Sequence, residues 1–164
     1  MDDALKGPRV SSMVEILLGV LDDAWSHPWE GLSSALDGIR EEEAAWRPPF
    51  YAAEEGKPGE PAPGTVRWHI DHLRRCKDEY AAQLSGEEVS SEEIVGDSLS
   101  ALRTRLEASH ARQRGALQAL SDDALRRERD GVPLAETIRA QIRHDTWHAA
   151  QIVIVRRAWR ESAK

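Results

Sequence analysis

The chain has 164 residues, of which 40% are hydrophobic and 31% charged, and its formal net charge is −7. This length suits one domain, so we expect residues 1–164 to form a single folded unit. The negative charge opposes nucleic-acid binding, which depends largely on positive side chains that neutralise phosphates. No apolar run is long enough for a membrane helix or a leader, and a lone cysteine, Cys76, excludes an internal disulfide. We expect a cytoplasmic protein that binds neither nucleic acid nor membranes.

The spacing of apolar residues predicts an all-α protein, because four stretches repeat apolar residues every three or four positions and none alternates as a strand does. The first stretch covers 11–39, follows the possible N-caps Ser11 and Ser12, and contains Pro28. Proline lacks an N–H and disfavours helix at the residue before it, so this helix should break there. Residues 47–64 hold five of the eight prolines, which predicts a long irregular connection between the first and second helices.

Three further helices are expected at 65–85, 98–120 and 133–160. Asp97 or Ser98 can cap the third helix. With the first helix they make four amphipathic segments, enough for a four-helix bundle with one long, proline-rich connection.

The fourth helix is unusual because the middle of its apolar face is polar. Buried polar groups cost roughly 1–3 kcal/mol each when unpaired, so a polar cluster in a core indicates partners, water or a metal ion. Histidines four residues apart point in the same direction, and two such imidazoles can reach one cation. The polar residues on this face are Gln141, His144, Asp145, His148 and Gln151.

A third histidine ligand must come from another helix, and the segment TVRWHIDHLRRC of the second helix offers His69 and His72. Apolar periodicity favours His69, which lies nearer the centre of the stripe. Three neutral imidazoles would leave positions on Zn²⁺, Ni²⁺ or Fe²⁺ open to water or substrate. His110 on the third helix is open to three interpretations: a ligand, a base in the pocket or a packed histidine. The alternative for the whole cluster is a hydrogen-bonded histidine network without metal.

Other polar residues of the fourth helix are candidates for supporting roles. Asp145 and Gln151 can orient the second ring nitrogens of the ligands, as outer groups at metal sites commonly do, and Gln141 belongs to the same set. Asp145 is also a candidate acid or base, together with the histidine of the third helix. The alternative for Asp145 is a salt bridge to Arg139 or Arg143.

Four segments resemble the DinB/YfiT-like metalloenzyme family, whose members are four-helix bundles. The last of these segments is the most specific, because the final helix of the family typically reads H-D-x-x-H-x-x-Q-I. The segments are Trp29 to Pro49, Thr65 to Leu73, Ala108 to Arg127 and Ile142 to Ala158.

This resemblance implies a ligand set that differs from the one favoured by periodicity. It assigns the metal to His72, His144 and His148, because the ligand of the second helix in this family is followed by a leucine or isoleucine. The position of His69 is usually aliphatic in the family, which makes His69 a core residue or a neighbour of the ligands. Glu30 stands where many members have a histidine.

The resemblance also implies zinc or nickel as the metal, a homodimer, and a bundle with a long crossover. Characterised relatives include S-transferases that use a low-molecular-weight thiol such as bacillithiol or mycothiol. The leading hypothesis is therefore an enzyme whose metal activates a thiol for attack on a small-molecule substrate, since a bound metal lowers the pKa of a thiol. Hydrolysis at the same site is the closest rival. A non-catalytic bundle that binds a small molecule or metal in a stress response is the alternative from another class.

Overall fold

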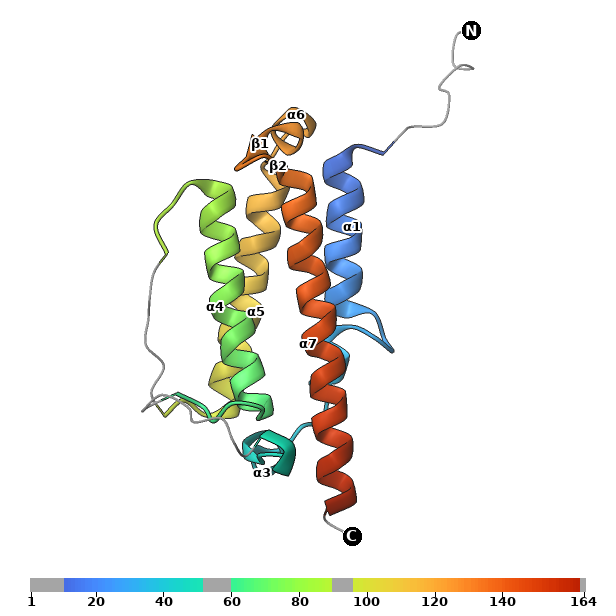
Figure 1. The fold of residues 1–164 in the computed structure, drawn as a ribbon, viewed down its shortest axis with the longest axis vertical. Coiled ribbons are helices and arrows are strands. Elements are labelled where there is room, and N and C mark those ends of the chain that lie inside the picture. The colour runs from blue at the N-terminus through green and yellow to red at the C-terminus, as the bar shows by residue number, and fades with distance from the viewer. Residues whose placement is uncertain (1–10, 52–59, 90–95, 163–164) are drawn as a thin grey trace, which may run out of the picture.

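The computed structural model describes residues 11–51, 60–89 and 96–162. Its long helices form a bundle (Figure 1), as the sequence predicts. Within the described ranges, strand structure is limited to two paired strands of two residues each, on either side of a turn. Among the described residues, none of the helices combines the length and the apolar character needed to cross a membrane. The elements are α1 (Met13–Ser26), α2 (Leu32–Ala35), α3 (Glu41–Ala45), the 3-10 helix η1 (Pro49–Tyr51), α4 (Val66–Ser85), α5 (Leu99–Gln118), α6 (Asp122–Arg126), β1 (Glu128–Arg129), β2 (Val132–Pro133) and α7 (Leu134–Ser162).

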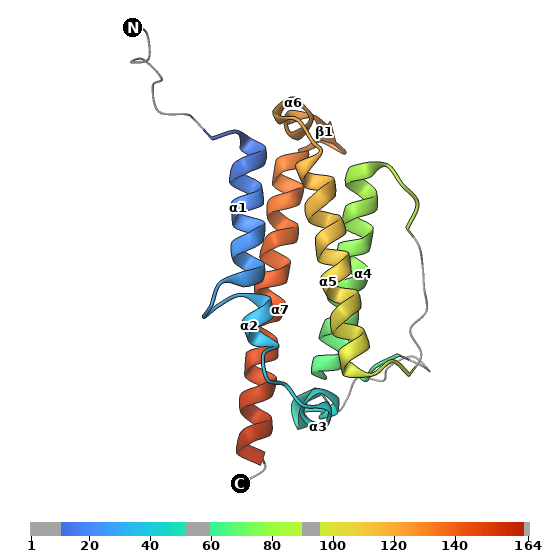
Figure 2. The ribbon, with the colours of Figure 1, turned by 180° about the vertical axis from the view of Figure 1, so that it is seen from behind.

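Helix α7 lies between α1 and α4, and α5 packs behind α4 (Figures 1 and 2). Helices α1 and α7 run in one direction and α4 and α5 in the other, so α4 and α5 are parallel neighbours. Consecutive parallel helices cannot be joined by a tight turn. The connection between α4 and α5 therefore has to return from one end of the bundle to the other, and this is the long crossover of the fold.

Side chains that satisfy free backbone N–H groups explain where the long helices begin. Ser12 forms a reciprocal capping box with Glu15 at the start of α1. Thr65 and Ser98 accept backbone N–H bonds at the starts of α4 and α5. Helix α4 ends at Gly86, whose φ of 77° is a left-handed conformation that glycine adopts without steric cost.

The predicted break at Pro28 is confirmed, but the predicted continuation of the first helix to residue 39 is wrong. Helix α1 ends at Ser26, and Nδ1 of His27 accepts the backbone N–H groups of Trp29 and Glu30. Beyond the break the chain forms only the short helix α2, which is followed by Gly38 with a φ of 61°. Part of the proline-rich connection, 52–59, lies outside the described residues.

The buried interior consists of two apolar clusters with a polar layer between them. Leu73, Leu106 and Ile152 belong to one cluster, and Leu117 and Ile138 belong to the other. The layer between them is built from buried polar side chains of α4, α5 and α7. These are His69, Lys77, Ser109, His110, Gln113, Gln141, Asp145 and His148.

Candidate metal centre

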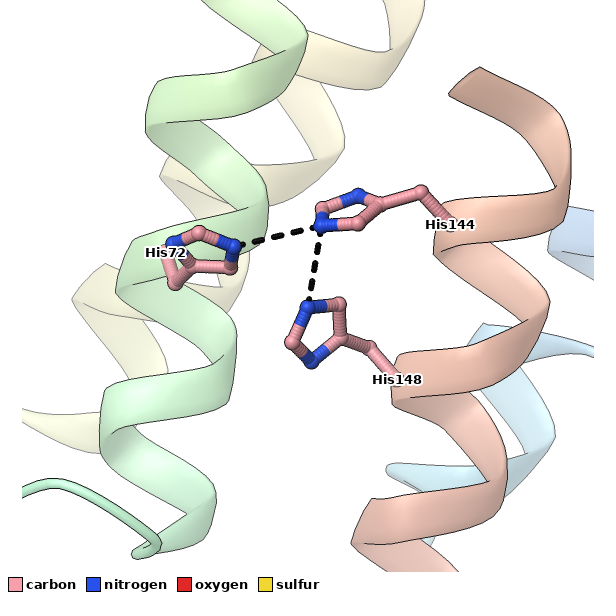
Figure 3. Close-up of side chains that lie close together, drawn as sticks. All are labelled: His72, His144 and His148. Atoms are coloured by element: carbon pink, nitrogen blue, oxygen red, sulfur yellow. Dashed lines mark hydrogen bonds between the residues drawn. The ribbon is translucent and has the colours of Figure 1, made fainter. Parts of the chain in front are cut away.

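Three histidines from two helices converge (Figure 3), and one of them, His148, belongs to the polar layer. Helix α4 supplies His72, and α7 supplies His144 and His148 from successive turns, as their four-residue spacing predicts. Nε2 of His144 lies 3.2 Å from Nε2 of His72 and 3.1 Å from Nε2 of His148. Among the described residues, these three form the group whose ligand atoms all lie within 4.8 Å of one another.

The donor set fits a divalent metal ion. Nitrogens bonded to one ion at 2.0–2.1 Å lie roughly 2.9–3.4 Å apart for octahedral to tetrahedral angles, and both short Nε2 separations fall in this range. Imidazole nitrogen is a ligand that suits zinc, nickel, copper and iron. His148 is buried, whereas His72 and His144 are half-buried. The cluster is therefore accessible to solvent on the side of His72 and His144.

Burial favours the neutral form of the three histidines, which is the form that could hold a metal ion. Burial, together with the charges of the neighbouring histidines, lowers the pKa of His148 to about 3. Burial is also the main cause of the lowered pKa values of His72 and His144. At neutral pH each ring therefore has a nitrogen lone pair available for a cation.

Tryptophan rings pack against two of the three histidines. Trp68 stacks on His72, with 5.0 Å between ring centroids and 1° between the planes. Trp147 meets His148 edge to face at 4.9 Å, and its side chain is 58% exposed. Both tryptophans precede a histidine in the sequence, and they help to form the wall around the cluster.

His144 also lines an open pocket between α4 and α7, with a volume of about 550 Å³. Its wall combines an aromatic surface with polar groups, including Gln141, whose buried Nε2 has no partner among the described residues. Arg143 stands at the same pocket. The residues lining the pocket are Tyr80, Gln83, Thr137, Ala140, Gln141, Arg143, His144 and Trp147.

The structure places His69 next to the three-histidine group rather than within it. Its Nδ1 lies 2.8 Å from Nδ1 of His148, the ring nitrogen that His148 does not direct at His144. The histidine of α4 that groups with His144 and His148 is thus His72, one turn further along the helix than the His69 that periodicity favoured. The two histidines are three residues apart on the same helix, and apolar spacing alone could not tell which one faces the cluster.

The partner of Asp145 is a lysine on another helix, not one of the neighbouring arginines. Lys77 of α4 is 0% exposed, forms an ion pair with Asp145 and donates a 3.0 Å hydrogen bond to Gln113 of α5. Neither Arg139, which pairs with Glu136, nor Arg143 takes this place. A signal for Lys77 did exist, because it lies four residues after Leu73 on the apolar stripe of α4.

Two of the remaining candidates, His110 and Gln151, lie outside the three-histidine group, whereas Cys76 lies close to one of its nitrogens. His110 stacks on Trp25 with 4.1 Å between ring centroids, and burial lowers its pKa to about 4. Gln151 has a buried Oε1 without a partner among the described residues, so it orients no ligand ring through that atom. Sγ of Cys76 is 3.6 Å from Nε2 of His72, and burial raises the pKa of this thiol to about 11.

Glu30, which replaces a histidine common in the resembling family, lies exposed in the turn after α1. Its backbone N–H donates to Nδ1 of His27. The structure thus gives Glu30 a place in a turn rather than in the histidine cluster.

Comparison with known proteins identifies one family. The model of the DinB superfamily matches residues 24–152, a range that includes all four clustered histidines and Lys77. No curated protein and no solved structure matches the chain.

Proposed function

The chain belongs to the DinB superfamily, and from this premise we propose that it is a metal-dependent enzyme that transfers a small thiol to an electrophilic small molecule. The observation that carries the proposal is the convergence of three Nε2 atoms at the edge of an open pocket. Zinc and nickel are among the cations that imidazole nitrogen suits, and they are the metals that the resemblance to the family implies. When bound, such a cation acts as a Lewis acid and lowers the pKa of a thiol at neutral pH.

The residues around the pocket suit binding of a small molecule more than activation of water. Trp147 and Tyr80 offer aromatic surfaces, while Gln141 and Arg143 offer hydrogen-bond donors. A pocket of this kind holds a ligand by apolar contact and orients it by a few polar groups.

Transfer of a thiol is preferred to hydrolysis because of where the two candidate bases lie. His110 packs on Trp25, and Asp145 is held in an ion pair with Lys77. Neither residue lines the pocket. A thiol already ionised by a metal needs no separate base for its attack, whereas activation of water commonly uses one. Hydrolysis therefore stays the second candidate.

The first test is metal content, measured by elemental analysis on protein purified without an affinity tag and after loading with Zn²⁺ or Ni²⁺. We expect about one ion per chain in the wild type, and loss of the ion in His72→Ala and His148→Ala. His110→Leu serves as the matched control, because it removes a buried histidine outside the cluster. A wild-type protein that takes up neither ion would refute the proposal.

The second test is turnover. Metal-loaded protein is assayed for loss of free thiol with bacillithiol, mycothiol and simpler cysteine-derived thiols against a panel of electrophiles, and in parallel for ester hydrolysis. Turnover with a thiol that disappears in His148→Ala supports the proposal. Hydrolysis alone would favour the second candidate, and a loaded protein without either activity would indicate a binding bundle.

A homodimer and a cytoplasmic location stay predictions, and light scattering on the purified protein tests the first.

A further inference from the structure

A fourth histidine contacts the metal centre from behind. His69 is 1% exposed, and its ring meets that of His148 at an angle of 61° with 5.0 Å between centroids. The two Nδ1 atoms are 2.8 Å apart, a normal hydrogen-bond length. This contact joins α4 to α7 on the side of His148 that points away from His144.

A hydrogen bond between two neutral imidazole nitrogens contains one proton, so one ring donates and the other accepts. If Nε2 of His148 is to hold a cation, that nitrogen has no proton and the proton of His148 sits on Nδ1. His148 then donates to Nδ1 of His69, and the single proton of His69 sits on its Nε2. Only this arrangement of the pair leaves the lone pair of His148 directed at the cluster.

We propose that His69 is a positioning residue, which fixes His148 in the tautomer and ring orientation that bind the metal. The inference rests on the proposed metal site and adds to it a residue outside the three ligands. Metal-binding histidines commonly donate their second N–H to an acceptor, and this acceptor raises the basicity of the ligand. Here the acceptor is another imidazole, in place of the more usual carboxylate or carbonyl.

The cost of burying His69 supports this role over simple packing. Its Nε2 is buried and has no partner among the described residues, and an unpaired polar atom in a core is unfavourable. An aliphatic side chain would fill the space without that cost. The hydrogen bond to His148 is what an aliphatic residue cannot provide.

Two substitutions separate the hydrogen bond from the packing. His69→Asn places an amide oxygen close to where Nδ1 stood, so an acceptor for His148 is retained, whereas His69→Leu removes the acceptor and keeps an apolar filling. The affinity for Zn²⁺ is measured by competition with a chromophoric chelator. We expect His69→Leu to weaken binding about 10-fold to 100-fold and His69→Asn to stay within a few-fold of the wild type. His110→Leu, which removes another buried histidine, should leave the affinity unchanged.

A readout that does not depend on the variants is ¹⁵N NMR of the histidine rings in the Zn²⁺-loaded wild type. We expect His148 to carry its proton on Nδ1 and that proton to exchange slowly with solvent. Equal Zn²⁺ affinity in the wild type and His69→Leu, or a His148 without a proton on Nδ1, would overturn the role of His69 while leaving the three-histidine site intact. Absence of Zn²⁺ binding in the wild type would instead reject the metal site itself.

Discussion

Lys77→Met tests the polar layer most directly. Methionine keeps most of the length of the lysine stem and removes the ammonium group. In the structure that group forms the ion pair with Asp145, donates to Gln113 and lies 5.7 Å from the ring centroid of Trp25. The substitution therefore leaves the surrounding packing largely filled and the carboxylate without a cation.

The expected loss of stability is large, because Asp145 is only 3% exposed and its Oδ1 already has no partner among the described residues. Breaking a buried ion pair by removing one partner typically costs about 3–5 kcal/mol. Replacing the whole pair by apolar residues is often close to neutral, so the double variant Lys77→Met/Asp145→Leu should lie within about 1 kcal/mol of the wild type. The two single substitutions should thus be strongly coupled.

The sign of the pH dependence gives a second check. Burial raises the pKa of Asp145, and Lys77 opposes this shift. Without Lys77 the pKa in the folded protein rises further, so the folded protein binds a proton that the unfolded chain releases. Stability is then lost as pH increases, and the deficit of Lys77→Met should be smaller at pH 5 than at pH 7.

The assay is urea unfolding of metal-free protein, followed by tryptophan fluorescence and circular dichroism at both pH values. Arg143→Met is the control, since it removes an exposed cation from α7 and should change stability by less than about 0.5 kcal/mol. A loss below about 1 kcal/mol in Lys77→Met at pH 7, or equal deficits at both pH values, would refute the account of a charged pair in the core.

Three further predictions concern the backbone, a helix cap and a buried histidine. Gly64→Ala should lower stability by about 1–3 kcal/mol in thermal unfolding. The φ of Gly64 is +79°, and a Cβ there would lie 2.3 Å from a ring atom of Tyr51. The control Gly19→Ala, in open space within α1, should be neutral or stabilising. Ser12→Ala should cost about 1 kcal/mol by loss of the capping box, and Ser11→Ala should cost little. Stability of the metal-free protein should rise with pH between about 4 and 6.5, because unfolded histidine binds a proton that buried histidine rejects. His110→Leu should reduce that slope by up to about 1.4 kcal/mol per pH unit, and an unchanged slope would contradict the lowered pKa of His110.

The long helices could be predicted from sequence because each buries an apolar stripe, and α1, α4 and α5 begin at a polar cap. The boundaries of α4, α5 and α7 agree with the expected ranges to within two residues. The segment after Pro28 could not be predicted equally well, since its apolar spacing resembles a helix while Gly38 adopts a positive φ that ends one. The parallel arrangement of α4 and α5 also left no local pattern, because it depends on which ends of the helices the connection joins.

At the site, the pair on α7 followed from spacing within one helix, whereas the choice on α4 depended on how that helix is rotated against α7. The resemblance to a known family, rather than periodicity, indicated His72. Lys77 carries a charge that is typical of surface residues, although its position on the apolar stripe of α4 points inward. The apolar stripe predicts that Asp145 faces the core, but the partners expected for it, Arg139 and Arg143, lie on the same helix, whereas Lys77 lies on α4.

The polar layer between the two apolar clusters also determines how α7 can slide along α4. A shift by one helical turn, about 5.4 Å, would move the position of Asp145 to that of Gln141 or Ala149. Lys77 would then face an amide or a methyl group instead of a carboxylate, and His72 would lose its alignment with His144. Apolar side chains alone would tolerate such a shift much better, since one aliphatic contact resembles the next. The layer therefore selects a single alignment of the two helices, and with it the alignment that assembles the histidine cluster.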